Sequence, residues 1–166
     1  MLGRYDNFPE NIHRIDTFTS SLPVRKTQDR IIQTLYGMNK KAIVSDEVDL
    51  QALRDCTVVF EAGVAEARSF NYLDETEMSK LQRAIKKEPL PIIDIFLAAC
   101  YYKTRGEKKS PLKFDYFFVR TVFQEKFLEV RIFHERGPRY ISPEDVAKIL
   151  VETVNKSASR RILKNA

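Results

Sequence analysis

Residues 114–134 alternate between two kinds of side chain, and this pattern constrains the fold more than any other feature of the chain. Aromatic and β-branched residues fill two stretches, Phe114–Phe123 and Phe127–His134, separated only by Gln124-Glu125-Lys126. A period of two is typical of a β-strand, and a short polar connection predicts that the two strands pair as an antiparallel hairpin. The chain therefore needs a sheet whose apolar face is covered.

The register of this hairpin decides which side chains share a face. A three-residue loop places Phe123 opposite Phe127 and Phe117 opposite Phe133. One face then carries four phenylalanines, with Thr121, Glu129 and Arg131 between them: Phe117, Phe123, Phe127 and Phe133. The other face is expected to pack against helices and holds Tyr116, Phe118, Val122, Leu128, Val130 and Ile132, with Arg120 as an exception.

Capping residues and helical spacing predict about four helices. Hydroxyls and Pro23 precede a helix at 24–40, Asp74 begins one at 74–87, and Ser142-Pro143 begins one at 143–156. Pro91 suits the first turn of a further helix over 92–103, which is apolar nearly all round and is therefore expected at the centre of the fold. A short helix is expected after Ser45-Asp46-Glu47.

These elements predict a single α+β domain over residues 1–166, with a mainly antiparallel sheet whose 114–134 hairpin packs against the helices. A chain of 166 residues with 43% hydrophobic residues can bury a full core. Residues 157–166 are expected to form a basic, flexible tail.

Few features of the sequence indicate a membrane-spanning segment or a metal site. The longest apolar stretch, 90–100, contains Pro91 and Asp94 and is far shorter than the ~20 residues of a membrane-spanning helix. The first residues lack the pattern of a signal peptide, so we expect a cytoplasmic protein that does not enter membranes. Two cysteines and two histidines without ligand spacing indicate neither a disulfide framework nor a metal site, and no cofactor is expected.

Positive charge is concentrated in two short segments. Residues 103–113 hold five cations and one acid, and residues 155–166 hold four cations and no acid. Each segment therefore carries +4, which leaves −3 on the rest of a chain whose net charge is +5. Local display of positive charge is expected of a protein that binds a polyanion, although solvated loops also collect such residues. The predicted phosphate contacts are Lys103, Arg105, Lys108, Lys109, Lys113, Lys156, Arg160, Arg161 and Lys164.

The face with four phenylalanines could serve three purposes. The N-terminal half of the chain could cover it, a protein partner or second copy could bind it, or bases of single-stranded nucleic acid could stack on its rings. Arg131 and Phe133 would join the nucleic-acid site in the third case.

Other function classes are less well supported. A winged-helix arrangement needs a polar recognition helix, whereas 92–100 is apolar. A metal-dependent nuclease would need Asp115 and Glu129 at one metal, yet the expected register separates them by ~20 Å. His13 and His134 have no partner at catalytic spacing. An enzyme whose residues come from separate segments stays open.

The sequence therefore favours a small non-enzymatic accessory subunit that binds DNA or RNA, preferably single-stranded, through residues 103–113 and the C-terminal tail. The alternative is a protein–protein assembly module, as a homo-oligomer or part of a larger complex, which uses the face of Phe117, Phe123, Phe127 and Phe133.

Overall fold

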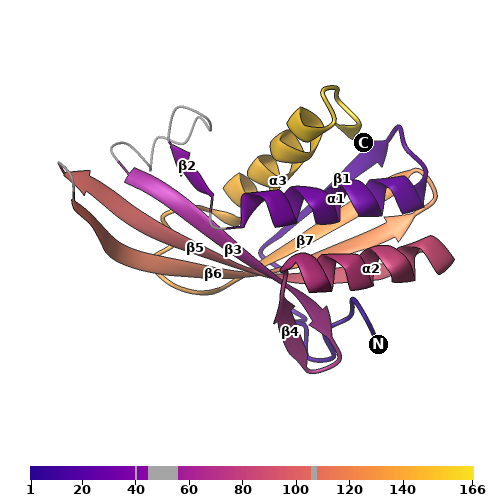
Figure 1. Cartoon of the computed structure of the whole chain (residues 1–166), viewed down its shortest axis with the longest axis horizontal. Coiled ribbons are helices and arrows are strands. Elements are labelled where there is room, and N and C mark those ends of the chain that lie inside the picture. Colours follow the sequence, from indigo (N-terminus) through magenta and orange to yellow (C-terminus); the bar gives the residue numbers. More distant parts are fainter. Residues whose placement is uncertain (40, 45–55, 106–107) are drawn as a thin grey trace.

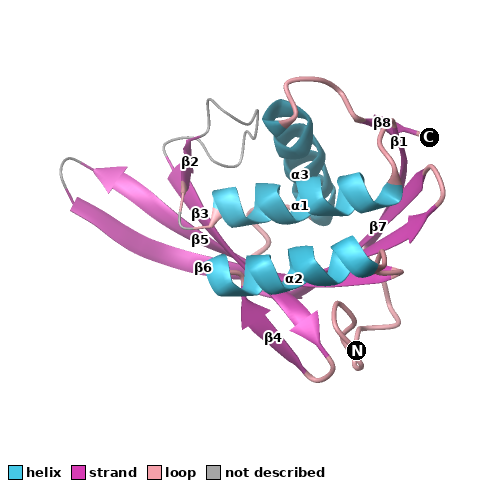
Figure 2. Cartoon of the chain, turned by 45° about the vertical axis from the view of Figure 1, so that its right-hand side comes forward, coloured by secondary structure: helices cyan, strands magenta, loops and turns pink. Residues whose placement is uncertain are grey.

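The fold is mixed α and β, with three helices on one face of an antiparallel sheet (Figures 1 and 2). The computed structural model describes residues 1–39, 41–44, 56–105 and 108–166, and the side chains at 42–44, 103–105 and 108–112 are outside the description. The elements are β1 (Arg14–Ser20), α1 (Val24–Met38), β2 (Ala42–Val44), β3 (Cys56–Glu66), β4 (Ser69–Tyr72), α2 (Glu75–Lys87), β5 (Ile92–Arg105), β6 (Lys108–Gln124), β7 (Phe127–Arg136), α3 (Pro143–Ser157) and β8 (Leu163–Asn165).

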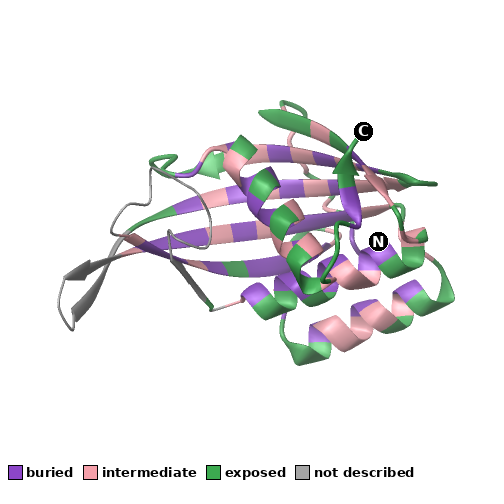
Figure 3. Cartoon of the chain, turned by 90° about the horizontal axis from the view of Figure 1, so that it is seen from above, coloured by how far each residue is buried: buried purple, intermediate pink, exposed green. Residues whose placement is uncertain are grey.

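The eight strands form one sheet in the order β2-β3-β5-β6-β7-β1-β8, and β4 pairs with β3. We call the face under the three helices the inner face and the opposite face the outer face. Buried and less buried residues alternate along the strands, as expected when the two faces differ in cover (Figure 3). Among the described residues, no helix is long and apolar enough to cross a membrane.

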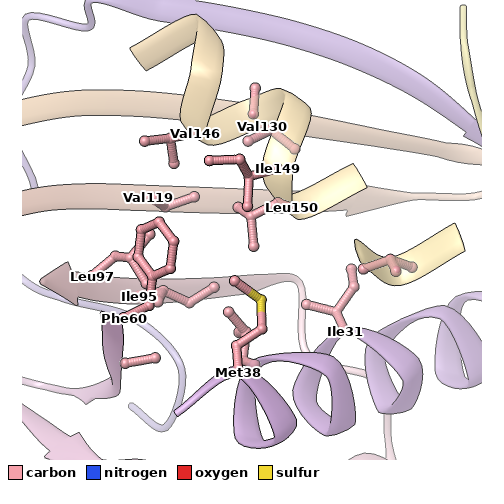
Figure 4. Packing of buried hydrophobic residues seen from close by; sticks show 14 of the residues in the cluster. Ile31, Met38, Phe60, Ile95, Leu97, Val119, Val130, Val146, Ile149 and Leu150 are labelled. Atoms are coloured by element: carbon pink, nitrogen blue, oxygen red, sulfur yellow. The ribbon is translucent and has the colours of Figure 1, made fainter. Parts of the chain in front are cut away.

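The helices pack through apolar faces that the sequence spacing predicts. Ile32 and Leu35 of α1, and Ile149 of α3, lie in one core cluster with Ile95 and Val119 of the sheet; Figure 4 shows Ile149, Ile95 and Val119 in this cluster. The expected caps are present in two helices. Asp74 accepts the backbone N–H of Glu77 at the start of α2, and Ser142 and Asp145 form a capping box at the start of α3.

The predicted helix at 92–103 is wrong, because these residues form β5, the central strand between β3 and β6. The segment is apolar on both sides because both faces of β5 are covered, and an apolar run of this kind does not distinguish a buried helix from a buried strand. The structure therefore has three helices over its described part. The short helix expected after Ser45 falls outside the described residues.

The predicted register of the two strands at 114–134 is off by one residue. β6 and β7 pair antiparallel with Phe123 opposite Leu128 and Gln124 opposite Phe127, which leaves a two-residue turn. A shift of one residue moves every side chain of one strand to the other face. Phe117 and Phe123 consequently pack toward the helices, whereas Phe127 and Phe133 belong to the outer face, so the four phenylalanines do not form a common surface.

The C-terminal segment is not the flexible tail expected from its charge. β8 pairs with β1, and Ile162 and Leu163 are buried in the core. The Asn155 side chain accepts hydrogen bonds from both of their backbone N–H groups, at 3.0 and 2.9 Å. Burial of two apolar residues among the three cations, together with these hydrogen bonds, anchors the segment.

Candidate nucleic-acid interface

A row of aromatic rings crosses the outer face of the three central strands. We call this row the aromatic ladder; its members are Phe114, Tyr116 and Phe118 of β6, Phe96 of β5 and Phe133 of β7. The alternation of each strand brings them together: Phe96 lies opposite Phe118, which lies opposite Phe133. Ring centroids are 6.0 Å apart for Phe114 and Tyr116 and 5.6 Å apart for Tyr116 and Phe96, with nearly parallel planes.

The N-terminal segment, residues 1–13, covers one end of the ladder. Tyr5 stacks on Phe118 with a centroid distance of 5.6 Å, and the His13 ring stacks on Phe133 at 4.6 Å. Phe70 of β4 lies against Phe118 from another side. This end of the outer face is therefore occupied by the chain itself.

A buried ion pair fixes the N-terminal segment in place. Asp94 is fully buried and receives two hydrogen bonds of 2.8 Å from the Arg120 guanidinium and one of 2.7 Å from the Tyr5 backbone N–H. The same guanidinium lies 4.3 Å from the centre of the Phe8 ring. A buried carboxylate is tolerated only when its oxygens are paired in this way. We therefore interpret the ion pair as a structural contact that holds the N-terminal segment against β5 and β6.

The N-terminal segment does not extend over the other end of the ladder, and among the described residues no comparable group of rings covers it. Phe114 is 45% exposed, and Tyr116 is partly exposed. The Arg136 guanidinium at the end of β7 lies 4.8 Å from the centre of the Tyr116 ring, which is cation–π geometry. Glu61 is an exposed acid on the neighbouring part of β3, opposite Ala98. An exposed ring, a second ring and a guanidinium are thus combined at one edge of the sheet.

A hydrogen-bond network on the inner face supports this end. The fully buried Asp115 carboxylate accepts the Tyr101 hydroxyl at 2.6 Å and lies 2.8 Å from Nε2 of His134. It also accepts the backbone N–H groups of Arg139 and Tyr140, at 2.7 and 2.9 Å. The network therefore fixes the turn that follows Arg136 against the strand that carries Phe114.

Gly137 allows the close approach of this turn. Its φ is +118°, and a Cβ atom there would lie 2.3 Å from the carbonyl oxygen of Phe114 and 2.4 Å from Oδ1 of Asp115. Only glycine adopts this conformation without strain and leaves room for the strand below. The position of Arg136 beside the ladder thus depends on a glycine.

The network also shifts the pKa values of its members. Burial alone would raise the pKa of Asp115, but hydrogen bonds from Tyr101, His134 and two backbone N–H groups lower it. Burial and the neighbouring carboxylate raise the pKa of the Tyr101 hydroxyl far above its ordinary value. Partial burial, with the positive charge of Arg139, lowers the pKa of His13, whose Nδ1 accepts the backbone N–H of His134. Asp115 is thus a charged acceptor with four donors, which suits a structural role.

The basic segment 103–113 lies on the same two strands as the exposed rings. Arg105 is paired with Lys108, and Lys103 with Ser110, so Lys109 and its neighbours lie at the far end of β5 and β6 (Figure 1). Lys113 is exposed and lies on the opposite face of β6 from Phe114. Backbone pairing thus places Lys103, Arg105, Lys108 and Lys109 on the continuation of β5 and β6 beyond Phe114.

The remaining predicted site residues lie away from the exposed end of the ladder. Arg131 is ion-paired with Glu129 at 2.6 Å, and Phe133 lies under the His13 ring. The C-terminal cations are exposed: Lys156, Arg160, Arg161 and Lys164. The C-terminus lies in the half of the molecule away from the β5–β6 end (Figure 1). The two positive segments therefore do not form one surface.

The sequence analysis missed Phe96, Phe114, Tyr116 and Arg136 as site residues. Phe96 was assigned to a helix, and the register error placed Tyr116 on the face expected to pack on helices. The alternation Phe114-Asp115-Tyr116 predicts buried rings and an exposed carboxylate, whereas Asp115 is buried and Phe114 is exposed.

In the part of the chain that the structure describes, no three His, Cys, Asp or Glu residues are grouped closely enough to hold a metal ion. The arrangement at the uncovered end instead provides a ring surface for stacking and cations for phosphate groups. No protein-family model, curated protein or solved structure matches this chain, so the geometry of this surface is the basis for assigning a function.

Proposed function

We propose that the protein binds single-stranded nucleic acid at the uncovered end of the aromatic ladder, without catalysing a reaction. A base stacks on the exposed face of Phe114 and extends the ladder, while Arg136 and the cations at the far end of β5 and β6 contact phosphates. The observation that carries the proposal is the exposed Phe114 ring, stacked parallel to Tyr116 on the strand whose far end holds Lys108 and Lys109.

The exposed rings support a single strand over a duplex. Base faces are accessible only when the strand is unpaired, and stacking on aromatic side chains is tolerant of sequence. The β6 members of the ladder, Phe114, Tyr116 and Phe118, follow that strand, so a chain laid along them meets Phe114 and then the basic end of β5 and β6. The C-terminus lies in the half of the molecule away from the β5–β6 end (Figure 1), so the proposed path does not include the C-terminal cations.

Phe114 has a matched control in Phe127. Both rings belong to the outer face and both are 45% exposed, but Phe127 lies at the β6–β7 turn, away from the basic end. Stacking of one base on an aromatic side chain contributes about 1–3 kcal/mol, so Phe114→Ala should weaken binding of a fluorescein-labelled dodecamer of uridine or thymidine about 5- to 150-fold. Phe127→Ala should leave the Kd unchanged.

Fluorescence anisotropy at about 50 mM salt measures both variants. Equal Kd values for Phe114→Ala and Phe127→Ala would remove the ladder from the site. Lack of binding by the unmodified protein at this salt concentration would contradict the proposal altogether, because phosphate contacts are strongest at low ionic strength.

A protein interface is the second candidate for the same face. Ile15, Phe114 and Phe127 are large apolar residues exposed on the outer face. Light scattering during size-exclusion chromatography distinguishes the two functions, because a dimer held by apolar contacts persists at high salt, whereas bound nucleic acid dissociates.

A further inference from the structure

A groove lies on the far side of the molecule from the aromatic ladder, between α1 and α3. Its volume is about 400 Å³, which is within the range of small-molecule sites. Residues at helical spacing on the two facing helices line it, and Met38 and Ile149 supply the apolar contacts. The hydroxyls of Thr34 and Ser157, 3.1 Å apart, join the two helices at this groove.

The charge at this groove is predominantly positive. Arg30, Lys41 and Lys156 line it, against the single acid Glu152. Among the residues that the structure describes, none of these three cations has an acidic partner within ion-pair distance. An apolar interior with unpaired cations is complementary to a molecule that has an apolar body and one negative group.

Gly37 widens the groove. It lies within α1 one residue before the end of the helix, its φ is not positive, and a Cβ atom there would meet nothing within 4 Å. Glycine within a helix destabilises it relative to alanine, and no turn or close contact requires glycine here. The open space at Gly37 therefore adds to the groove without serving the fold.

We propose that the α1–α3 groove binds an amphipathic organic anion, a small molecule with an apolar body and one carboxylate, sulfonate or phosphate group. The apolar body lies between Met38 and Ile149, and the anionic group is held by Arg30 and Lys156. This site is independent of the aromatic ladder, so its test does not depend on nucleic-acid binding.

The probe is 8-anilinonaphthalene-1-sulfonate, whose fluorescence reports entry into an apolar site, and N-phenyl-1-naphthylamine is its uncharged counterpart. Gly37→Leu fills the groove with a side chain that the backbone accepts, and Tyr36→Leu is the control on the exposed side of α1, outside the groove. Lys156→Gln removes one cation, and Lys148→Gln removes an exposed α3 cation that does not line the groove. Thermal unfolding shows that each variant is folded.

We expect saturable binding of the sulfonate by the unmodified protein, at least tenfold weaker in Gly37→Leu and unchanged in Tyr36→Leu. Lys156→Gln should weaken binding about three- to fivefold, the effect of one solvent-accessible charge contact, and Lys148→Gln should not. Lack of saturable binding, or equal affinity in Gly37→Leu, would overturn the site. Equally tight binding of the uncharged probe would overturn the assignment of an anion.

Discussion

Replacing Tyr101 by phenylalanine tests the buried network beneath the interface. The substitution removes one hydroxyl and keeps the ring, so it creates no large cavity. Tyr101 and Asp115 are both fully buried, and the lost hydrogen bond is 2.6 Å long. A hydrogen bond to a charged group contributes about 1.5–3 kcal/mol, so Tyr101→Phe should lower the free energy of unfolding by that amount. For a chain of this length, the melting temperature should fall by about 3–12 °C.

Urea unfolding followed by circular dichroism measures the change, with Tyr140→Phe as the control. Tyr140 lies against Tyr101 but is 40% exposed, so removal of its hydroxyl should change the free energy of unfolding by less than about 0.5 kcal/mol. The dependence of this free energy on urea concentration should be the same for both variants and the unmodified protein.

Equal stability of Tyr101→Phe and Tyr140→Phe would refute the reasoning, because it would mean that the Tyr101 hydroxyl does not stabilise the Asp115 carboxylate. A decrease in the free energy of unfolding well above 3 kcal/mol for Tyr101→Phe would also contradict the reasoning. It would mean that the three remaining donors to Asp115 do not hold the turn without the Tyr101 hydroxyl.

Four further outcomes follow from the same structure. The pKa of the Asp115 carboxyl is lowered from its ordinary value of 3.8, so the stability it contributes is complete above that pH and is lost as pH falls through the lower folded-state pKa. Asp115→Asn should therefore lower the free energy of unfolding by about 3–5 kcal/mol at pH 7. In urea unfolding at several pH values, this difference from the unmodified protein should shrink below pH ~4. Gly137→Ala should cost at least about 2 kcal/mol in the same assay, because φ is +118° and the added Cβ overlaps a backbone oxygen. Asp94→Ala leaves Arg120 without its partner and should speed cleavage of the N-terminal segment in limited proteolysis, with a loss of about 3–5 kcal/mol. Gly37→Ala should stabilise the protein by about 0.5–1 kcal/mol in thermal unfolding, because the new Cβ meets no atom within 4 Å.

The elements that the sequence predicts best are those with local signals. Ser142-Pro143-Glu144-Asp145 and Asp74 begin α3 and α2 as expected, because capping depends on residues within one turn. The segment 92–105 has no such signal: its apolar residues satisfy a buried helix and a buried strand equally well, and only pairing with β3 and β6 decides between them.

The proposed interface is partly predictable from the sequence. The cations of 103–113 are predicted from the sequence, because they are clustered within a short segment of the chain. The ladder depends on the register of β6 and β7, which a two-residue turn shifts by one position, so Phe117 is buried while Phe114 is exposed. The cover provided by Tyr5 and His13 is a contact between segments far apart in sequence, which no local pattern reports.

A titration of the ¹⁵N-labelled protein with an unlabelled thymidine dodecamer, followed by backbone amide resonances, tests the proposed interface most directly. The account predicts chemical-shift changes at Phe114, Tyr116, Arg136 and the far end of β5 and β6, and constant shifts along 156–166. Changes confined to 156–166, or none at millimolar oligonucleotide, would contradict it.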